Sequence, residues 1–419
     1  MYANFPPQFL AFLKENHIDP SVYDVQGGLP RYVRIVRYKQ RTASEIQRLV
    51  KQTQHDAGCT VTEVAGVPGF LEIADQSVKL AQLQGYGSGD LVGMDVSSGI
   101  AVHALSVAPG DNVLDLCCAP GAKLLLLAEQ SMDTIAPGSV TGVDNSSHRI
   151  ATCRSLIKKH AGRTRGIVRL FAADGTNFAC HAPRKLWWDA QAVGAFAQQN
   201  PAVAVAADSS VANERPWFAP RLLSTAYACS GTALYDRVLV DAECTHDGSL
   251  VHIRKYGEQW GWEQLGSQAS GSGRTQPVPV LQSRLLENGW RLLKPGGVLV
   301  YSTCSLSRFQ NELVLGGFLA RHGDDEASVE PIPLFDEKDS GCEIEALPIW
   351  KPETDEEWVR HGLGSQLRAL FQRMQHAARL DPRVSNTSGM FIARIRKIGD
   401  NSKGTIETEI VPLGQSSMT

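Results

Sequence analysis

The sequence predicts an α/β protein in which a doubly wound, mostly parallel sheet follows a small amino-terminal α+β domain. Two observations support this. From about residue 87 onward, short apolar runs rich in β-branched residues alternate with helical patterns. Before residue 87, a helical run is followed by an alternating strand and an amphipathic helix. Strands separated by helices are joined by right-handed crossovers, so the main sheet is expected to carry helices on both faces.

The first 86 residues form the predicted α+β domain. A helix is expected over 8–17 ("QFLAFLKENH"), a strand over 31–39 ("RYVRIVRYK") and a helix over 44–53 ("SEIQRLVKQT"). Between residues 31 and 51, seven side chains are basic and one is acidic. Such a charge run is typical of a solvated strand face with helix partners. Contact with phosphate groups is the second interpretation.

Residues 87–398 form the predicted main domain. Its strands are expected within five apolar runs, each of which ends in small or acidic residues, near residues 111–117, 138–144, 166–175, 236–241 and 296–304. An alanine-rich stretch at about 181–232 has no clear periodicity and is longer than an ordinary connection, so it is predicted to be an insertion that is partly mobile. The tail, 399–419, is expected to be disordered.

Composition narrows the class of protein. The 419 residues carry a net charge of -3, so a polyanionic partner would have to bind a local basic patch. The nine cysteines include no C-x-x-C pair. This favours reduced thiols over disulfides, and with them an intracellular compartment (cytoplasm, nucleus or mitochondrion). It also makes a zinc site unexpected. No run is long enough to span a membrane, and no secretory or transit signal is visible. We therefore expect neither a metal nor a membrane partner.

The ends of the predicted strands outline a ligand crevice. In doubly wound sheets, the loop after the first strand meets the ligand. In this chain that loop is "CCAPGAK" (117–123), which lacks both G-x-G-x-x-G and the G-K-[ST] of a phosphate cradle. Asp144, Asp174 and Asp241 end three further strands. Each aspartate taken alone is explained by a helix cap or a turn. Together they predict an acidic crevice that suits a sulfonium or an adenosine better than a pyrophosphate.

Two cysteines follow neighbouring predicted strands. Cys304 comes directly after the fifth strand, and Cys244 lies three residues after Asp241 at the end of the fourth. Packing explains a single cysteine, because free cysteine is often buried. Two thiols and an aspartate beside a sulfonium donor fit another reaction. Methylation of carbon 5 of cytosine requires a thiolate to add first at carbon 6, and the carbon 5 proton must then be lost before the thiolate leaves.

Three motifs carry a family resemblance. The segments "DLCCAPGAK" (115–123), "LVDAECT" (239–245) and "LKPGGVLVYSTCSL…NE" (293–312) resemble, in order and spacing, the motifs of the Nop/Nol/Sun family of RNA cytosine-5 methyltransferases, which includes the bacterial RsmB-like enzymes. The segments 30–50 and 379–397 are similar to the family's RNA-contacting segment and its closing strand. The resemblance implies a Rossmann-like fold, S-adenosylmethionine as the cofactor, and RNA (tRNA or rRNA) as the substrate.

The resemblance also implies roles for individual residues. Cys304 would be the nucleophile, Cys244 would assist product release, Asp241 would hold the cytosine edge, and Lys123 would lie at the base of the active site. Arg34, Arg37 and Lys39 would contact RNA phosphates. The residues implied to contact S-adenosylmethionine are Cys117, Cys118, Ala119, Pro120, Gly121, Ala122, Lys123, Asp144, Arg149, Asp174 and Asp241.

The sequence departs from the family pattern at three places. Ala122 replaces a glycine in the cofactor loop, Glu243 replaces the proline before Cys244, and "THDGS" (245–249) replaces "SGxG". A carboxylate beside a thiol disfavours the thiolate, so Glu243 would weaken the role of Cys244 in product release.

Three functions therefore stay open. The first is a methyltransferase that forms 5-methylcytosine in RNA with the base flipped out of its stack. The second is a catalytically impaired RNA-binding or assembly factor of the same fold. The third is a methyltransferase for a protein or a small molecule, which would have no use for the paired cysteines.

Overall fold

The computed structural model describes eleven stretches of the chain: 5–25, 28–160, 162–184, 186–191, 195, 198, 215–224, 233–263, 276–336, 341–349 and 367–399. Most of the predicted insertion and the tail from 400 lie outside the described residues. Among the helices that are described, none combines the length and the apolar character needed to cross a membrane.

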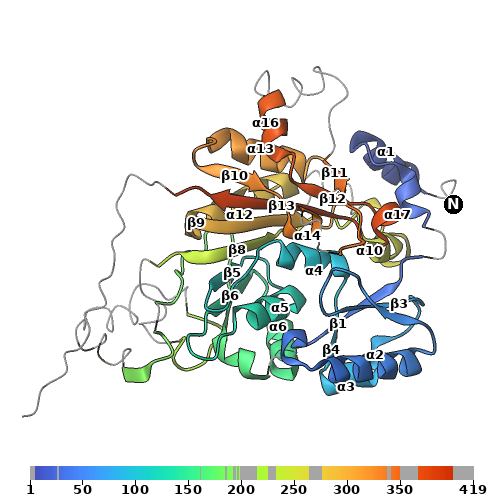
Figure 1. Cartoon of the computed structure of the whole chain (residues 1–419). Helices are drawn as coiled ribbons and strands as arrows, with labels where there is room; N and C mark the ends of the chain where they lie inside the picture. Colours follow the sequence, from blue (N-terminus) through green and yellow to red (C-terminus); the bar gives the residue numbers. More distant parts are fainter. Residues whose placement is uncertain are drawn as a thin grey trace, which may run out of the picture.

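A nine-stranded sheet forms the centre of the molecule (Figure 1). Five neighbouring strands run parallel in the order β7-β6-β5-β8-β9. Beyond β9, β13 and then β12 and β11 pair antiparallel, and β10 pairs with the other part of β13. The strands are β5 (Asn112–Asp115), β6 (Ser139–Asp144), β7 (Val168–Ala172), β8 (Tyr235–Asp241), β9 (Leu293–Thr303), β10 (Ala327–Glu330), β11 (Leu347–Pro348), β12 (Ala378–Leu380) and β13 (Met390–Lys397). The predicted doubly wound fold is confirmed.

Helices cover both faces of this sheet, as its buried strands require. On one face, α4 (Val96–His103), α5 (Ala122–Ser131) and α6 (Ser147–His160) bury leucine and isoleucine side chains against β5, β6 and β13. On the other, α12 (Val278–Leu292), α13 (Glu312–Arg321) and α16 (Leu367–Met374) pack over β8, β9 and β10. Short helices complete this part: α10 (Leu250–Lys255), α14 (Pro333–Asp336) and α17 (Pro382–Ser385).

The strand order reverses at β5, which lies between β6 and β8. At such a switch point the connections leave the sheet in opposite directions and open a crevice at the carboxyl ends of the strands. The loop 117–121 and the residues after β6, β8 and β9 all begin at this edge. The topology therefore gathers the predicted site residues of the main domain at one place.

A second sheet, with four strands in the order β2-β3-β1-β4, lies beside the first (Figure 1). It consists of β1 (Arg31–Ile35), β2 (Val61–Glu63), β3 (Phe70–Ile73) and β4 (Leu91–Gly93), with α2 (Ala43–Ala57) and α3 (Gln84–Ser88) packed around it. Thr42 and Glu45 form a reciprocal capping box at the start of α2. The expected division at residue 86 stays a prediction, although the pairing of β4 with β1 extends this small sheet to Gly93.

The amino-terminal helix does not join the small sheet. Helix α1 (Pro7–Glu15) packs Phe9, Phe12 and Leu13 into a cluster with Ile253 and Tyr256, which belong to α10 and to the turn after it. The side chain of Asn16 contacts Ser307, just beyond the end of β9. The amino terminus therefore braces the segments that follow β8 and β9.

The basic strand is shorter than the sequence pattern predicts. Strand β1 ends at Ile35, and Arg37 adopts a left-handed backbone conformation with φ 57°. Its backbone N–H donates to the Glu129 carboxylate over 2.8 Å. With β1 ending at Ile35 and a left-handed backbone at Arg37, the strand alternation that the sequence predicted does not extend to Arg37.

The prediction that Arg34 contacts RNA phosphates is wrong. The Arg34 side chain is 1% exposed, and its Nη1 lies 2.8 Å from Oε2 of Glu129 on α5. The guanidinium of Arg34 is therefore already paired with a buried carboxylate of the neighbouring domain. Arg37 is half-buried, and Lys39 is exposed.

We expect Arg34→Met to destabilise the protein by about 3–5 kcal/mol, because it leaves the Glu129 carboxylate buried without the positive charge that is paired with it. The urea midpoint, followed by circular dichroism, measures this. Lys39→Met is the matched control and should shift stability by less than about 0.5 kcal/mol. An equal effect of the two substitutions would show that the buried ion pair has no structural importance.

Candidate active site

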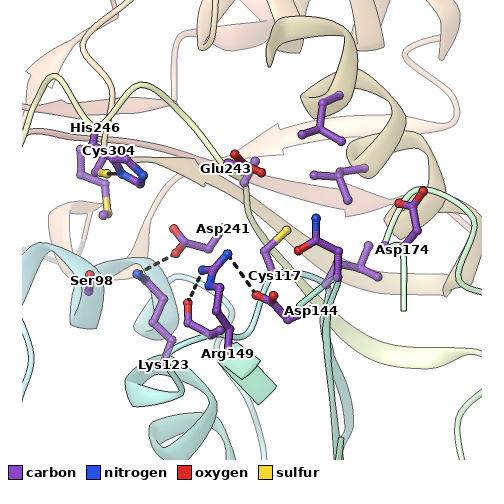
Figure 2. Close-up of a pocket in the computed structure, with 18 residues that line it drawn as sticks. Ser98, Cys117, Lys123, Asp144, Arg149, Asp174, Asp241, Glu243, His246 and Cys304 are labelled. Atoms are coloured by element: carbon purple, nitrogen blue, oxygen red, sulfur yellow. Dashed lines mark hydrogen bonds and ion pairs between the residues drawn. The ribbon is translucent and has the colours of Figure 1, made fainter. Parts of the chain in front are cut away.

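A polar cavity of about 280 Å³ opens at the carboxyl ends of β5, β6, β8 and β9 (Figure 2). Cys304 and His246 lie at one end, Asp144 and Asp174 lie toward the other, and Lys123 and Asp241 lie between them. The predicted residues that line it are Cys117, Ala119, Lys123, Asp144, Arg149, Asp174, Asp241 and Cys304. Most of the predicted site of the main domain is thus brought together.

The cofactor loop turns sharply into α5. Gly121 adopts φ +109°, and a Cβ there would lie 3.2 Å from Cα of Cys153, so glycine meets both a conformational and a steric requirement. Ala122 begins the helix in ordinary helical geometry, which accommodates its extra methyl group. Pro120, Gly121 and Ala122 do not line the cavity. Their position indicates that they shape the loop.

Cys118 points away from the cavity, although it was predicted to contact the cofactor. Its side chain is buried, and its Sγ lies 3.9 Å from Sγ of Cys153 on α6. Burial raises the pKa of this thiol well above its ordinary value, so it stays protonated. The physical reason for the difference is the turn after β5, which directs Cys117 into the crevice and the next side chain into the helix–sheet core.

Asp144 ends β6 with a buried carboxylate that is partly covered by an arginine. Its Oδ1 accepts the Ser146 backbone N–H over 3.0 Å, and Oδ2 lies 3.4 Å from Arg149 Nη1. Arg149 also donates to the carbonyl oxygen of Ala119 over 3.1 Å (Figure 2). The arginine thus ties the end of the second strand to the loop after the first.

Sequence reasoning missed Asp115, the last residue of β5. Burial, followed by the charge of Asp241, raises the pKa of this carboxyl group from 3.8 to about 8. Its Oδ1 accepts the Cys117 backbone N–H over 3.3 Å, whereas Oδ2 is buried without a hydrogen-bond partner. The position of an acid at the end of the first strand was visible in the sequence, but its burial was not.

Asp115 should make stability depend on pH. Between about pH 4 and pH 8 the folded protein holds a proton on this carboxyl group that the unfolded chain has lost, so stability falls as the pH rises toward 8. Asp115→Asn cannot ionise and should gain stability relative to the wild type between pH 5 and pH 8. Urea midpoints at several pH values measure the difference. Parallel pH profiles would contradict the assignment.

Lys123 and Asp241 form an ion pair that lines the cavity (Figure 2). Lys123 Nζ lies 2.8 Å from Asp241 Oδ2, and Ser302 Oγ donates to Asp241 Oδ1 over 2.8 Å. Although burial lowers the pKa of Lys123, the Asp241 carboxylate outweighs it, and the net pKa is raised. Because β8 and β9 pair Asp241 with Ser302 in register, this arrangement follows directly from the sheet.

The two predicted thiols meet beside this ion pair. Cys244 Sγ lies 3.4 Å from Cys304 Sγ. Cys304 lines the cavity, whereas Cys244 is buried behind it. The hydrogen bond with Cys244, followed by burial, raises the pKa of the Cys304 thiol well above its ordinary value, and His246 opposes that rise. Two thiols at this distance do not both ionise readily.

Sequence reasoning also missed His246. Its Nδ1 lies 3.0 Å from Cys304 Sγ and 3.6 Å from Cys244 Sγ. The departure "THDGS" from the family motif was the available signal. Glu243, which was expected to disturb Cys244, lines the middle of the cavity and lies away from the Cys304–His246 pair (Figure 2).

The side chains of Cys244, His246 and Cys304 carry the types of atom that bind metal ions. The ligand atoms of Cys244, His246 and Cys304 all lie within 4.8 Å of one another. A structural zinc site takes four protein ligands, and this group provides three. The expectation that the protein holds no metal stays a prediction.

The basic segment lies away from the cavity. Arg37 and Lys39 line a separate hollow with Glu129 and Gln130, near the carboxyl end of α5. Lys123, in contrast, is in the first turn of α5, and this ten-residue helix is about 15 Å long. Arg37 and Lys39 are therefore not brought to the site that Cys304 occupies.

Sequence comparison relates this chain to RNA-modifying enzymes. Residues 223–396 match the family described as 16S rRNA methyltransferase RsmB/F. A Ribosomal RNA small subunit methyltransferase B from Xanthomonas campestris is 28% identical over 306 residues, 71% of this chain and 52% of that protein. The 5-cytosine rRNA methyltransferase NSUN4 of Bos taurus is 30% identical over 240 residues, 57% of this chain and 47% of that protein. The chain thus spans about half the length of the curated relatives that it matches.

Structure comparison supports the same fold. A methyltransferase homologue from Pyrococcus horikoshii has a TM-score of 0.57 at 21% identity, covering 95% of this chain and 97% of that one. The NSun6 of the same organism, solved with SFG, has a TM-score of 0.57 at 15% identity, covering 94% of this chain and 99% of that one. The family resemblance drawn from the sequence is confirmed. Residues 223–396 of this chain are thus similar to the methyltransferase domain described for the RsmB/F family of rRNA methyltransferases.

Proposed function

We propose that this protein is an S-adenosylmethionine-dependent methyltransferase that forms 5-methylcytosine in RNA through a covalent cysteine adduct. The observation that carries the proposal is the pair of thiols, 3.4 Å apart, beside the Lys123–Asp241 ion pair at the edge of an open cavity. Methylation of an oxygen or an amine needs no thiol nucleophile, so this arrangement favours cytosine carbon 5 over a protein or small-molecule acceptor.

The Cys304 thiolate forms the first bond. Its Sγ adds to carbon 6 of cytosine, and the electron pair of the 5,6 double bond makes carbon 5 nucleophilic. The Lys123–Asp241 pair faces the cytosine edge, where the carboxylate can accept a hydrogen bond from the exocyclic amine and the ammonium stabilises the charge that develops on the ring. After carbon 5 is methylated, its proton passes to a water molecule, the electron pair of that carbon–hydrogen bond re-forms the 5,6 double bond, the carbon 6–sulfur bond breaks, and Cys304 leaves as a thiolate. We assign assistance in this release to Cys244.

The residues of the crevice fit S-adenosylmethionine, which supplies the methyl group when bound. Asp144 offers the buried carboxylate that accepts hydrogen bonds from ribose hydroxyls in doubly wound folds. The carboxylates of Asp174 and Asp241 suit the cationic end of such a ligand. The loop 117–121 contributes Cys117 and Ala119 to the lining. The Asp144 carboxylate would contact both Arg149 and the ribose when the cofactor is bound. A neighbouring structure was solved with SFG, an S-adenosylmethionine analogue, which supports the same cofactor.

RNA is the proposed partner inside the cell, and we favour rRNA over tRNA because the curated relatives are named for rRNA.

The test of the proposed function is incubation of the protein with total RNA and methyl-labelled S-adenosylmethionine, followed by digestion of the RNA to nucleosides. We expect label in 5-methylcytidine. Label in protein or in another nucleoside would contradict the proposal. RNA binding without incorporation would favour the non-catalytic RNA-binding factor.

Lys39 and Arg37 stay proposed phosphate contacts. We expect Lys39→Ala to weaken RNA binding and to reduce the slope of log affinity against log salt by about 0.7–0.9, the value for one lost phosphate contact. Filter binding across a salt series measures the slope. Lys79→Ala, a change at another lysine of the small domain, is the control. An unchanged slope would mean that this segment is a solvated face.

A further inference from the structure

The Cys304 thiol needs a base. The hydrogen bond with Cys244, followed by burial, raises its pKa well above the ordinary value, so on these two grounds alone the thiol would be neutral near pH 7. A neutral thiol does not add to an aromatic ring carbon, because the thiolate is the nucleophile. The structure gives Cys304 Sγ two hydrogen-bond partners, the Cys244 thiol and Nδ1 of His246.

We propose that His246 is a catalytic residue that removes the proton from Cys304. The bond between the proton and Sγ of Cys304 breaks, and the proton moves to Nδ1 of His246 over a separation of 3.0 Å. The products are a thiolate and an imidazolium, and no other reactant is needed. The inference rests on the proposed function for its purpose, but the acid–base pair itself requires neither RNA nor the methyl donor.

The position of the ring selects between the two thiols. Nδ1 is 0.6 Å closer to Cys304 (3.0 Å) than to Cys244 (3.6 Å). Cys304 and His246 both line the cavity, and Cys244 does not. An imidazolium stabilises the nearer anion more strongly. His246 therefore directs ionisation to the thiol that faces the substrate.

The surroundings of His246 stabilise its charged form. Burial lowers the pKa of His246, but the Cys304 thiolate and the carboxylates of Asp247 and Asp241 together outweigh burial, so that the pKa is raised. His252 stacks on the ring with centroids 4.7 Å apart. Burial, followed by the charge of His246, lowers the pKa of His252 to about 4, so this neighbour is neutral near pH 7 and does not repel an imidazolium.

The loop 245–249 holds His246 in a strained conformation. The backbone of His246 has φ 56°, which residues other than glycine seldom adopt. Gly248 donates its N–H to the carbonyl oxygen of Cys304 over 2.9 Å, and Tyr256 donates its hydroxyl to the carbonyl oxygen of Thr245 over 3.1 Å. A Cβ at Gly248 would lie 2.8 Å from the same Cys304 oxygen. These contacts fix the ring beside the thiol.

The experiment measures the alkylation rate of Cys304 by iodoacetamide between pH 5 and pH 10. Peptide mass spectrometry separates Cys304 from Cys244, and a chelator is present throughout so that no bound metal masks the thiols. We expect His246→Gln to lower the rate at pH 7 by about tenfold or more, and the difference from the wild type should shrink as the pH rises toward 10. His252→Gln, which keeps the contact between His246 and the thiol, should stay within about twofold of the wild type.

A second variant makes the test independent of folding defects. His246→Gly suits the left-handed backbone and leaves space for a ring, so added imidazole should restore alkylation at pH 7. An identical pH profile for wild type and His246→Gln, or a loss that is uniform at every pH and is not rescued by imidazole, would overturn the proposal. Alkylation requires no RNA, so failure of the proposed methyl transfer would leave this result unaffected.

Discussion

Cys304→Ala is expected to abolish methyl transfer, with a loss of at least about 10³-fold in single-turnover rate, because Cys304 is the thiol that lines the cavity and is proposed to form the bond to carbon 6. Binding of S-adenosylmethionine should stay within about threefold of the wild type, because Asp144 and Asp174, two of the carboxylates proposed to hold the cofactor, lie toward the opposite end of the cavity. Labelled methyl incorporation into RNA and equilibrium dialysis of the cofactor measure the two effects.

Cys59→Ala is the matched control for Cys304→Ala. Cys59 is a free thiol of the small domain that packs near α2, and its loss should leave methyl transfer unchanged. Turnover by Cys304→Ala at a rate near that of the wild type would exclude this residue as the nucleophile. Loss of both cofactor binding and turnover would indicate a collapsed site instead.

Cys244→Ala is expected to methylate its RNA once and then to remain attached to it. Cys304 can still add to carbon 6, but the proposed help in breaking the carbon–sulfur bond is missing. We expect a slow-migrating, RNase-sensitive band on a denaturing gel in the presence of S-adenosylmethionine. Cys304→Ala should give no band, and the double variant should also give none.

This assay can directly contradict the roles assigned to the two thiols. A band with Cys304→Ala and none with Cys244→Ala would mean that the roles are reversed. The geometry favours Cys304 as the nucleophile, because Cys304 lines the cavity while Cys244 is 3% exposed and lies behind it.

The fold could be predicted from the sequence because its signals are local and repeated. Each strand of the parallel sheet is an apolar run followed by a polar turn and a helix, and β6 with α6 shows the pattern in 139–160. The antiparallel strands β11 and β12 span two and three residues and carry too little pattern to be recognised. The register of β8 with β9, which places Asp241 beside Ser302, follows from their adjacency in the sheet.

Most of the site was predictable from residues that end or follow strands of the main sheet, although Asp115 at the end of β5 was missed. Lys123, Asp241, Cys244 and Cys304 are brought together because parallel strands share one carboxyl edge. Arg34 could not be placed correctly, since its partner Glu129 is 95 residues away in the sequence and lies on another domain. A basic side chain on a strand is the same in sequence whether it meets a phosphate or a buried carboxylate.

His246 was missed for a different reason. Its role depends on a loop conformation with φ 56° and on the close approach of Gly248 to the Cys304 carbonyl group, and neither follows from residue type. The sequence marked the place, because "THDGS" departs from the family motif, but the meaning of the departure required the distance between Nδ1 and Sγ.

The most direct test of the proposed chemistry is to identify the atom that links protein and RNA. Transcripts of rRNAs and tRNAs made with 5-fluorocytidine would be incubated with the wild-type protein and S-adenosylmethionine. Fluorine at carbon 5 cannot leave as a proton does, so the adduct persists while both thiols are present. After digestion, peptide mass spectrometry is predicted to find a 5-methyl-5-fluoro-dihydrocytidine attached to Cys304. Attachment to Cys244, or the absence of any adduct with every transcript, would contradict the covalent mechanism through Cys304.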